Sequence, residues 1–286
     1  MGRFQEAIAG ALTGSTEVLL MQPSNFWKTE LQQKRFNLSR ALNPKYAYRG
    51  VTIAAMAIAP VVAIQFSMNG ACLSALSALS SSTSTTTTTT TTKPPTATIS
   101  ILSGVIAGVS SALFQSPFQL IEINQQKHGG TIAAVVQKIA RTHGTRALWR
   151  GLSMTATREG LFCCSYIAVS PLLGRALYER TSLNDSMSLL VGALLGGSMG
   201  AVLTHPADTL KTRLQGDLFA VEGSGREPVN IHVRAALKDM VVTWGRKPSN
   251  VMFGMYAGFT PRLFRLICCT LIYGQLNPFY SSMLEE

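Results

Sequence analysis

Charged residues are scarce in this chain. They make up 14% of its 286 residues, whereas apolar residues make up 47%. A soluble domain normally carries about a quarter of charged residues, most of them at its surface. The chain therefore has too few charges to cover an exterior that faces water. This composition argues against a soluble protein and favours one whose main solvent is lipid.

Features that catalysis requires are also missing. The sequence shows no nucleophile–base pair, phosphate-binding glycine loop or metal cluster. The cysteines have no CxxC spacing, and most lie in apolar runs where cysteine packs as a small hydrophobic residue: Cys72, Cys163, Cys164, Cys268 and Cys269. No histidine is spaced with another ligand, and we expect all four at the surface: His128, His143, His205 and His232. The chain is predicted not to be an enzyme and to hold no metal or other cofactor.

Six apolar stretches are long enough to cross a bilayer, which takes about 20 residues per helix. They cover 7–22, 51–78, 99–116, 152–178, 187–205 and 259–282. The first, third and fifth end directly before a proline, at Pro23, Pro117 and Pro206. These prolines recur about every ninety residues, which indicates an internal repeat.

Three further features recur in register with the prolines. Small residues four apart, which let helices approach closely in lipid, precede each proline: Gly10 and Gly14, Gly104 and Gly108, Ala193 and Gly197. A glutamine follows each proline by nine residues: Gln32, Gln126 and Gln215. Each copy then has an aromatic residue, a variable residue and a glycine, ending at Gly50, Gly151 and Gly258. The sequence thus predicts an all-α membrane protein of six transmembrane helices in three pseudo-symmetric repeats, at 1–98, 99–184 and 185–286.

The basic residues predict the topology. Of 25 Lys and Arg, 18 lie in 24–50, 118–150 and 207–257, which join odd to even spans. The positive-inside tendency places these three segments on one side of the membrane and both chain ends on the other. The net charge of +11 does not predict nucleic-acid binding, because it divides among three equivalent loops. Residues 80–95, with an unbroken threonine run, are interpreted as a flexible low-complexity insert in the first repeat.

The repeat resembles that of the mitochondrial carrier family, in which P-x-[DE]-x-x-[KR] precedes an aromatic-basic-glycine element. The third copy matches fully with Pro206, Asp208 and Lys211. The first copy has Asn25 before Lys28, and the second has Gln119 before Glu122. The resemblance covers nearly the whole chain and implies helices around a central cavity with alternating access. It also implies a multi-pass protein of the mitochondrial inner membrane that acts as an antiporter and a monomer and binds cardiolipin near Gly50, Gly151 and Gly258.

The motif implies a gate on the matrix side. The prolines would kink the odd helices so that their ends converge. By the family arrangement, the gate pairs would be Asp208 with Lys28, Asn25 with Glu122, and Gln119 with Lys211. The three glutamines would brace these links. One ion pair in place of three implies a loosely held gate.

No ionic gate can form on the opposite side. The family motif [FY]-[DE]-x-x-[KR] should end each even helix, but the expected acid positions hold Gly70, Pro171 and Pro278. The expected basic positions hold Leu73, Gly174 and Ser281. This departure puts strict exchange in doubt and leaves open a carrier-derived scaffold or receptor without transport.

Ionisable residues inside membrane spans are costly, and their default interpretation is functional. Arg158 and Arg265 each lie seven residues beyond the glycine of their copy, about 10 Å along the helix, and Ala57 matches them in the first copy. In the family these are the substrate contact positions. Internal ion pairs with Glu159 or Glu17 are the alternative, and snorkelling to the membrane surface would equally explain Arg262.

The substrate clues disagree. Arg158 followed by Glu159 resembles carriers of amino acids and of zwitterions like carnitine, because the arginine can hold a carboxylate and the glutamate an ammonium group. Glu17 resembles an acid of the oxodicarboxylate and citrate carriers. The sequence favours the zwitterion and leaves the di- or tricarboxylate open. Met1 to Gly10 carries only Arg3 and no signal-peptide core, so we expect targeting information inside the chain.

Overall fold

The computed structural model describes residues 3–34, 36–82, 96–216, 233–245 and 247–283, and all elements in these ranges are helices. Five long helices are α1 (Arg3–Gln32), α4 (Val51–Ser82), α5 (Ala97–His128), α9 (Asp185–Gly216) and α12 (Phe259–Met283). A sixth long segment consists of α7 (Leu152–Cys163), the π-helical turn η2 (Cys164–Val169) and α8 (Ser170–Arg180). The short elements are α2 (Leu38–Ala41), α3 (Pro44–Ala47), α6 (Ile132–His143), the 3₁₀ turn η1 (Thr145–Trp149), α10 (Val233–Trp244) and α11 (Pro248–Met255).

Four helical segments are long and apolar enough to cross a membrane. They cover Pro44–Leu79, Ala97–His128, Thr145–Arg180 and Asp185–Gly216. The expected spans at 7–22 and 259–282 lie in α1 and α12, which are not among these four. The helical membrane class predicted from composition is therefore observed. Residues 83–95, most of the threonine-rich insert, lie outside the described residues, and 80–82 end α4.

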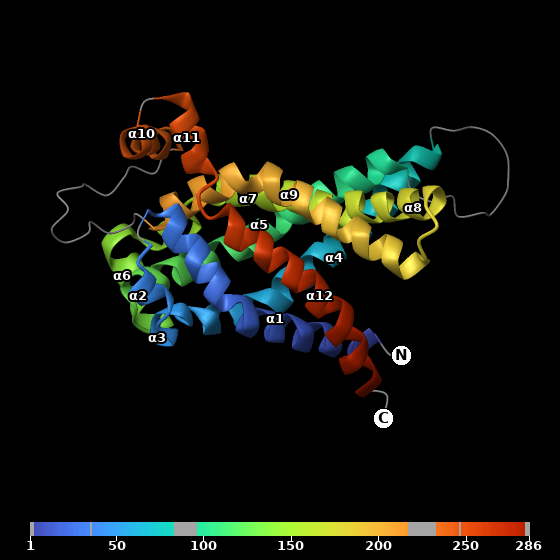
Figure 1. Ribbon diagram of the computed structural model, residues 1–286, viewed down its shortest axis with the longest axis horizontal. Coiled ribbons are helices and arrows are strands. Elements are labelled where there is room, and N and C mark those ends of the chain that lie inside the picture. Colours follow the sequence, from blue (N-terminus) through green and yellow to red (C-terminus); the bar gives the residue numbers. More distant parts are fainter. Residues whose placement is uncertain (1–2, 35, 83–95, 217–232, 246, 284–286) are drawn as a thin grey trace.

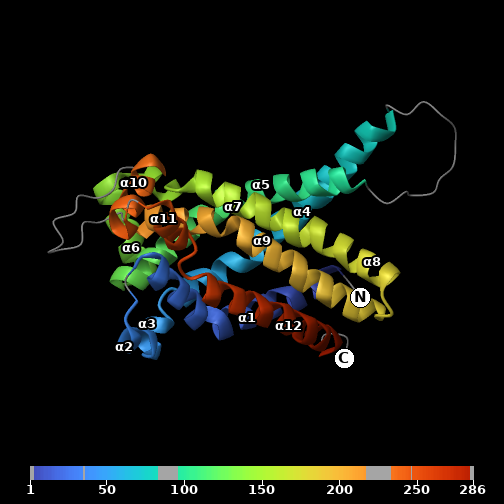
Figure 2. The same cartoon turned by 45° about the horizontal axis from the view of Figure 1, so that its top comes forward.

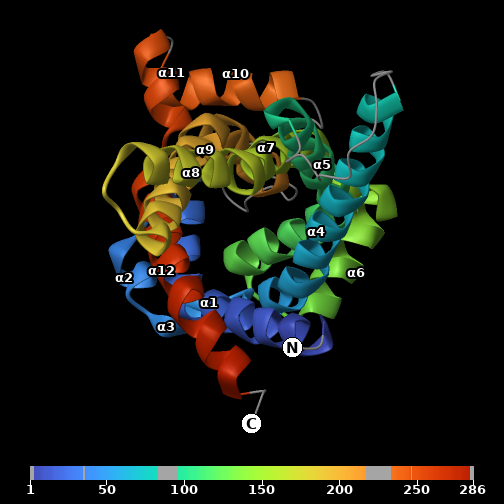
Figure 3. The ribbon, with the colours of Figure 1, turned by 90° about the vertical axis from the view of Figure 1, so that its right-hand side faces the viewer.

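The long segments pack in a closed order. α1 packs against α4, α4 against α5, α5 against α7, and α7 and α8 against α9; α9 packs against α12, which returns to α1. Figure 3 looks along the long axis and shows this ring. The start of α1 and the end of α12 lie at the same end of the ring as α8, whereas α2, α3, α6, α10 and α11 gather at the other (Figures 1 and 2). We call these the chain-end side and the short-helix side.

Glycines allow the backbones to approach closely. A Cβ atom on Gly108 would lie 2.3 Å from the Glu159 carbonyl oxygen, and one on Gly192 would lie 2.5 Å from the Gly174 nitrogen. Gly104 also faces α7–η2 backbone, at Cys164. In the third copy, Gly197 faces the Leu266 side chain of α12, and a Cβ there would lie 3.3 Å from it. The close contact with the preceding segment is made by its neighbours on α9.

The apolar stretches end at the prolines, but the helices do not. Pro23, Pro117 and Pro206 lie inside α1, α5 and α9. Each helix continues for a further nine to eleven residues, and these added turns are rich in buried polar side chains. Apolar content predicts which part of a helix contacts lipid. It does not predict where the helix ends when its last turns carry polar residues that face other helices.

Candidate functional site

Three side-chain links join the turns that follow the prolines. They connect α1 with α9, α1 with α5, and α5 with α9. The pairs are Lys28 Nζ and Asp208 Oδ2 at 3.0 Å, Asn25 Nδ2 and Glu122 Oε1 at 2.7 Å, and Lys211 Nζ and Gln119 Oε1 at 2.8 Å. Each partner named from the sequence is the partner found, so the polar turns of the three odd helices are tied in a cycle.

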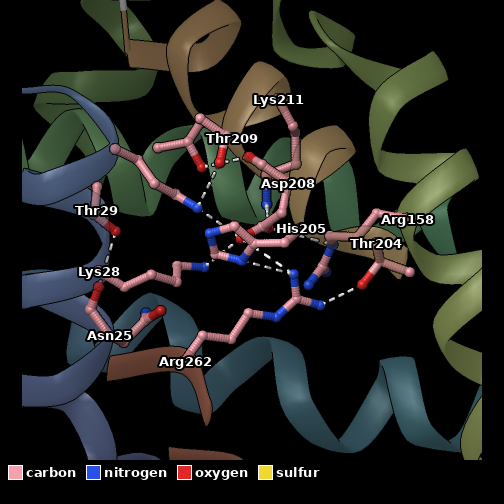
Figure 4. Close-up of polar contacts among 12 residues, drawn as sticks. Asn25, Lys28, Thr29, Arg158, Thr204, His205, Asp208, Thr209, Lys211 and Arg262 are labelled. Carbon is pink, nitrogen blue, oxygen red and sulfur yellow. Dashed lines mark hydrogen bonds and ion pairs between the residues drawn. The ribbon is translucent and has the colours of Figure 1, made fainter. Parts of the chain in front are cut away.

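Asp208 is the centre of this cluster. Its side chain is fully buried and lies within 4 Å of four cations. Figure 4 shows these around it: Lys28, Arg158, Lys211 and Arg262. Arg158 Nε lies 3.6 Å from Oδ1, and Arg262 Nη1 lies 3.8 Å from Oδ2. Lys211, one helical turn away, lies 3.7 Å from Oδ1. A carboxylate removed from water needs such compensation, because an unpaired buried charge is very costly.

Arg262 is held by α9 and does not snorkel. Its Nη2 donates to Thr204 Oγ1 at 2.6 Å, and its Nη1 lies 3.4 Å from His205 Nδ1. His205 Nε2 lies 3.0 Å from the Ala257 carbonyl oxygen, so this nitrogen carries the proton and Nδ1 accepts from the guanidinium. The expectation that His205 lies at the surface is wrong, since it is fully buried beside Pro206. Sequence spacing could not reveal this, because its partners come from a distant helix.

Two arginines named as substrate contacts form ion pairs inside the bundle. Arg158 Nη2 contacts Glu159 Oε1. Arg265 donates through Nε and Nη2 to Glu17 Oε1 at 3.0 and 2.9 Å, and Cys269 Sγ contacts the same oxygen at 2.8 Å. In both pairs the carboxylate side chain is 4% exposed, whereas the arginine side chain is 14% exposed for Arg158 and 32% for Arg265. The arginine is therefore the more exposed residue of each pair, although Arg158 Nε itself is buried.

The remaining residue named as a substrate contact is also mostly buried. Ala57 on α4 is 8% exposed. It carries no polar side-chain group, so the first copy offers only shape and apolar surface at this position.

The three glutamines differ in their contacts. Gln32 Nε2 donates to Asp208 Oδ2 at 3.0 Å, and Gln126 Nε2 donates to Glu122 Oε1 at 3.2 Å. Gln215 Nε2 donates to the Arg150 carbonyl oxygen at 3.2 Å. Two glutamines thus touch acids of the links, while the third touches backbone.

A second set of contacts, missed from the sequence, caps the ends of the odd helices. Arg213 Nε donates to the Gln32 carbonyl oxygen at 3.0 Å, at the end of α1. Asn124 Nδ2 donates to the Gln215 carbonyl oxygen at 3.0 Å, at the end of α9. Lys127 Nζ donates to the next carbonyl, that of Gly216. Donors at a helix C-terminus satisfy its unpaired carbonyls and oppose its negative end.

These caps have a register that the sequence did show. Arg213 and Asn124 each lie seven residues after the proline of their copy, and Glu30 holds this place in the first copy. A carboxylate cannot donate to a carbonyl, and Glu30 instead lies 3.6 Å from Arg40 Nη1. The recurrence of this position was a signal that a search for charged pairs alone passed over.

The glycine of each aromatic-x-glycine element packs against the odd helix of another copy. Gly50, Gly151 and Gly258 have φ of +81°, +78° and +78°, which L-residues with side chains rarely adopt. A Cβ on Gly50 would lie 3.0 Å from Glu122 Cγ, and one on Gly258 would lie 2.8 Å from the Lys28 carbonyl oxygen. Glycine is therefore required both by the backbone turn and by the close approach.

The six positions at which an ionic gate would lie on the chain-end side hold uncharged residues. Gly70 has open space around its Cα, and Gly174 packs against Leu189. Within the described ranges, no group of three or more His, Cys, Asp or Glu side chains could hold a metal ion. The chemistry available at this site is the exchange of ion-pair and hydrogen-bond partners.

Arginine–carboxylate pairs inside a helical membrane bundle are an arrangement expected of a transport protein. The sequence profile described as "Mitochondrial carrier protein" matches residues 93–180 and 184–285, and the chain belongs to this family. It is therefore a multi-pass transport protein of the mitochondrial inner membrane and not an enzyme.

Individual relatives share about a quarter of their residues with this chain. A probable mitochondrial 2-oxodicarboxylate carrier of Schizosaccharomyces pombe is 25% identical, over 90% of this chain and 86% of its own. The mitochondrial citrate transporter D of Aspergillus niger is 25% identical, over 91% and 87%. A mitochondrial glycine transporter of Emericella nidulans is 26% identical, over 72% and 71%. The relatives have different substrates, so similarity alone gives the family and not the solute.

Proposed function

We propose that this carrier moves a small metabolite with two carboxylate groups across the mitochondrial inner membrane. The observation that carries the proposal is the burial of the two pairs, Arg158 with Glu159 and Arg265 with Glu17. In each pair the carboxylate side chain is covered and the arginine side chain is the more exposed one. A planar guanidinium binds carboxylate in a bidentate geometry. Two such groups facing one chamber therefore suit a solute with an acid at each end.

The substrate class departs from the preference that the sequence alone gave. A zwitterion needs an accessible acid for its ammonium group, and Glu159 is 3% exposed. The printed names of two relatives, a 2-oxodicarboxylate carrier and a citrate transporter, agree with a di- or tricarboxylate. An amino-acid- or carnitine-like zwitterion is the second candidate, favoured by the contact of Arg158 with an acid that an ammonium group could take over.

The proposed architecture is six transmembrane helices in three repeats around this chamber. Two cycles of contact support it. The links run from the first copy to the second, from the second to the third, and from the third to the first. The glycine elements follow the same cycle, since Gly50, Gly151 and Gly258 face Glu122, Gln215 and Lys28. We further propose that the three prolines kink the odd helices, that cardiolipin binds near the three glycines, and that the carrier acts as a monomer.

In the proposed cycle, the described conformer is closed to the matrix, and the short-helix side faces the matrix. The gate consists of the three links and their glutamines. Arg158 couples the chamber to the gate because it contacts Asp208 at 3.6 Å as well as Glu159. A solute carboxylate that binds Arg158 draws it away from Asp208. Asp208 then loses one of its four neighbouring cations, so less free energy is needed to part the three links.

Uptake by reconstituted liposomes tests this proposal. Oxoglutarate, citrate, lysine, ornithine and carnitine would be supplied to vesicles that hold the wild-type chain or Arg158→Ala. We expect uptake of oxoglutarate or citrate by the wild type, and loss of that uptake in the variant. Uptake of lysine, ornithine or carnitine alone would replace the dicarboxylate with the zwitterion. A chain that moves none of them, and whose cellular role tolerates Arg158→Ala, would be a scaffold.

A further inference from the structure

Two polar side chains occupy equivalent places toward the chain-end side of the contact residues. Gln65 lies eight residues beyond Ala57 on α4, and Tyr166 lies eight residues beyond Arg158 in η2. Eight residues advance a helix by about 12 Å. Gln65 is buried and continues the buried stripe of α4 at four-residue spacing: Ile53, Ala57, Val61 and Gln65. The third copy has Tyr273 at this place, and its side chain lies outside the described part of the chain.

These two side chains are joined by a directed hydrogen-bond chain. The Tyr166 hydroxyl donates to Gln65 Oε1 at 2.7 Å, and Gln65 Nε2 donates to Ser111 Oγ at 3.1 Å. The Ser111 hydroxyl donates in turn to the Gly108 carbonyl oxygen at 2.9 Å. Cys163 Sγ lies 3.8 Å from the Tyr166 hydroxyl, as a thiol donor to it. The bond from Tyr166 to Gln65 connects η2 with α4, although α5 packs against both.

The backbone that carries Tyr166 is held on two sides. η2 has a π-helical turn in which the Ser170 N–H bonds to the Ser165 carbonyl. On the side of α5, a Cβ on Gly104 would lie 3.1 Å from Cys164 Cα. On the side of α9, a Cβ on Gly200 would lie 2.6 Å from Ser165 Cβ. Single π turns occur frequently at functional sites. Here the turn is fixed between two helices, so the phenol has a defined position.

We propose that Tyr166 and Gln65 form a neutral clasp that limits the separation of α4 and α7–η2 and so controls access to the chamber from the chain-end side. The residues that could make an ionic gate there are replaced by Gly70, Pro171 and Pro278. The clasp lies between those positions and the contact arginines, where it supplies a contact between even helices. This inference rests on the proposed function, because it takes the chamber between the arginines as the solute path.

Cys163 reports on the clasp, because it is fully buried directly beside the phenol. The test uses a chain in which Cys163 is the only cysteine. Its labelling by a membrane-impermeant thiol reagent would be timed from the chain-end side. Tyr166→Phe removes the hydroxyl and keeps the ring, and Gln65→Leu removes the acceptor without touching Cys163. Tyr178→Phe, at an exposed tyrosine of α8, is the matched control.

We expect either variant to raise the labelling rate about two- to tenfold, the population change that corresponds to one net hydrogen bond. The double variant should be no faster than the faster single variant, because both remove the same bond. Tyr178→Phe should leave the rate unchanged. Equal rates in all chains, or effects of the two variants that multiply, would overturn the clasp. Thermal unfolding of each variant shows that it is folded.

Labelling does not depend on transport, so the two proposals can fail separately. If no carboxylate is moved but labelling rises as expected, the proposed solute is wrong and the clasp stands. If oxoglutarate or citrate is moved and labelling stays constant, the clasp is wrong and the transport proposal stands.

Discussion

The two ends of the bundle are held by different kinds of contact. At the short-helix side, Asp208 lies among four cations, three links join the odd helices, and donors cap helix ends. At the chain-end side, the corresponding positions carry glycine, proline, leucine and serine, and a neutral bond from Tyr166 to Gln65 joins two even helices. Charges in a low-dielectric interior interact far more strongly than neutral dipoles. Parting the short-helix side would break more of these contacts, which supports the proposal that this conformer is closed there.

Removal of the Asp208 charge should weaken the short-helix side most strongly. Asp208→Asn keeps the shape but leaves Lys28, Arg158, Lys211 and Arg262 without their shared partner. Breaking a buried ion pair costs about 3–5 kcal/mol. We expect a large drop in the thermal unfolding temperature in detergent and loss of uptake. Asp185→Asn, at the exposed start of α9, should have little effect, and equal behaviour of the two variants would show that Asp208 is not the hub.

Arg158→Ala should have the next largest effect, because it removes both the guanidinium proposed to bind the solute and one contact of Asp208. Truncating one partner of a buried charge pair typically costs about 2–5 kcal/mol, which predicts uptake reduced by at least about thirtyfold. Initial uptake rates in liposomes measure it. The exposed Arg175 on α8 supplies the control, Arg175→Ala. Unchanged uptake in Arg158→Ala would contradict both the binding and the coupling role.

Arg213→Ala tests the caps rather than the links. It should leave the α1 C-terminus without its donor, at a cost of about 1.5–3 kcal/mol for a hydrogen bond to a charged group. We expect a lower unfolding temperature and a chamber more accessible from the short-helix side. Asn124→Ala should act in the same direction but more weakly, because its donor is neutral. An Arg213→Ala chain as stable as the wild type would remove the caps from the account.

Gln119→Glu should strengthen the short-helix side and should have the smallest effect of these variants. It converts the link to Lys211 into a second ion pair, so the short-helix side should be held more firmly. The gain in the free energy of unfolding should be about 1 kcal/mol, because desolvation offsets most of the attraction. We expect slower uptake together with a slightly higher unfolding temperature. Gln137→Glu, on an exposed face of α6, is the control, and faster uptake in Gln119→Glu would contradict the gate.

The links could be predicted from the sequence because their positions are fixed relative to the prolines. Asn25, Lys28, Gln119, Glu122, Asp208 and Lys211 each stand two or five residues after a proline, and the repeat gives the pairing. The environment of Arg262 and His205 could not be predicted, because it depends on how α9 and α12 pack. The bond from Tyr166 to Gln65 was missed for another reason. Neither residue is ionisable, and the π turn that positions the phenol has no evident sequence mark.

The burial of the acids also could not be read from the sequence. Glu17 and Arg265 are 248 residues apart, and only the fold shows that the arginine covers the carboxylate. The sequence therefore favoured a zwitterion, whereas the burial of both acids behind their arginines favours an acid at each end of the solute. Residue identity gives the charges available to a site, and packing decides which of them a ligand can reach.

Access to the chamber from the two sides tests the central claim most directly. Cys269, which contacts Glu17 beside Arg265, would be kept as the only cysteine and labelled with an impermeant thiol reagent in vesicles of each orientation. We expect rapid labelling from the chain-end side and slow labelling from the short-helix side. Asp208→Asn should make labelling from the short-helix side faster. If Cys269 of the chain with Asp208 intact were labelled faster from the short-helix side than from the chain-end side, the proposed closure of the short-helix side would be contradicted.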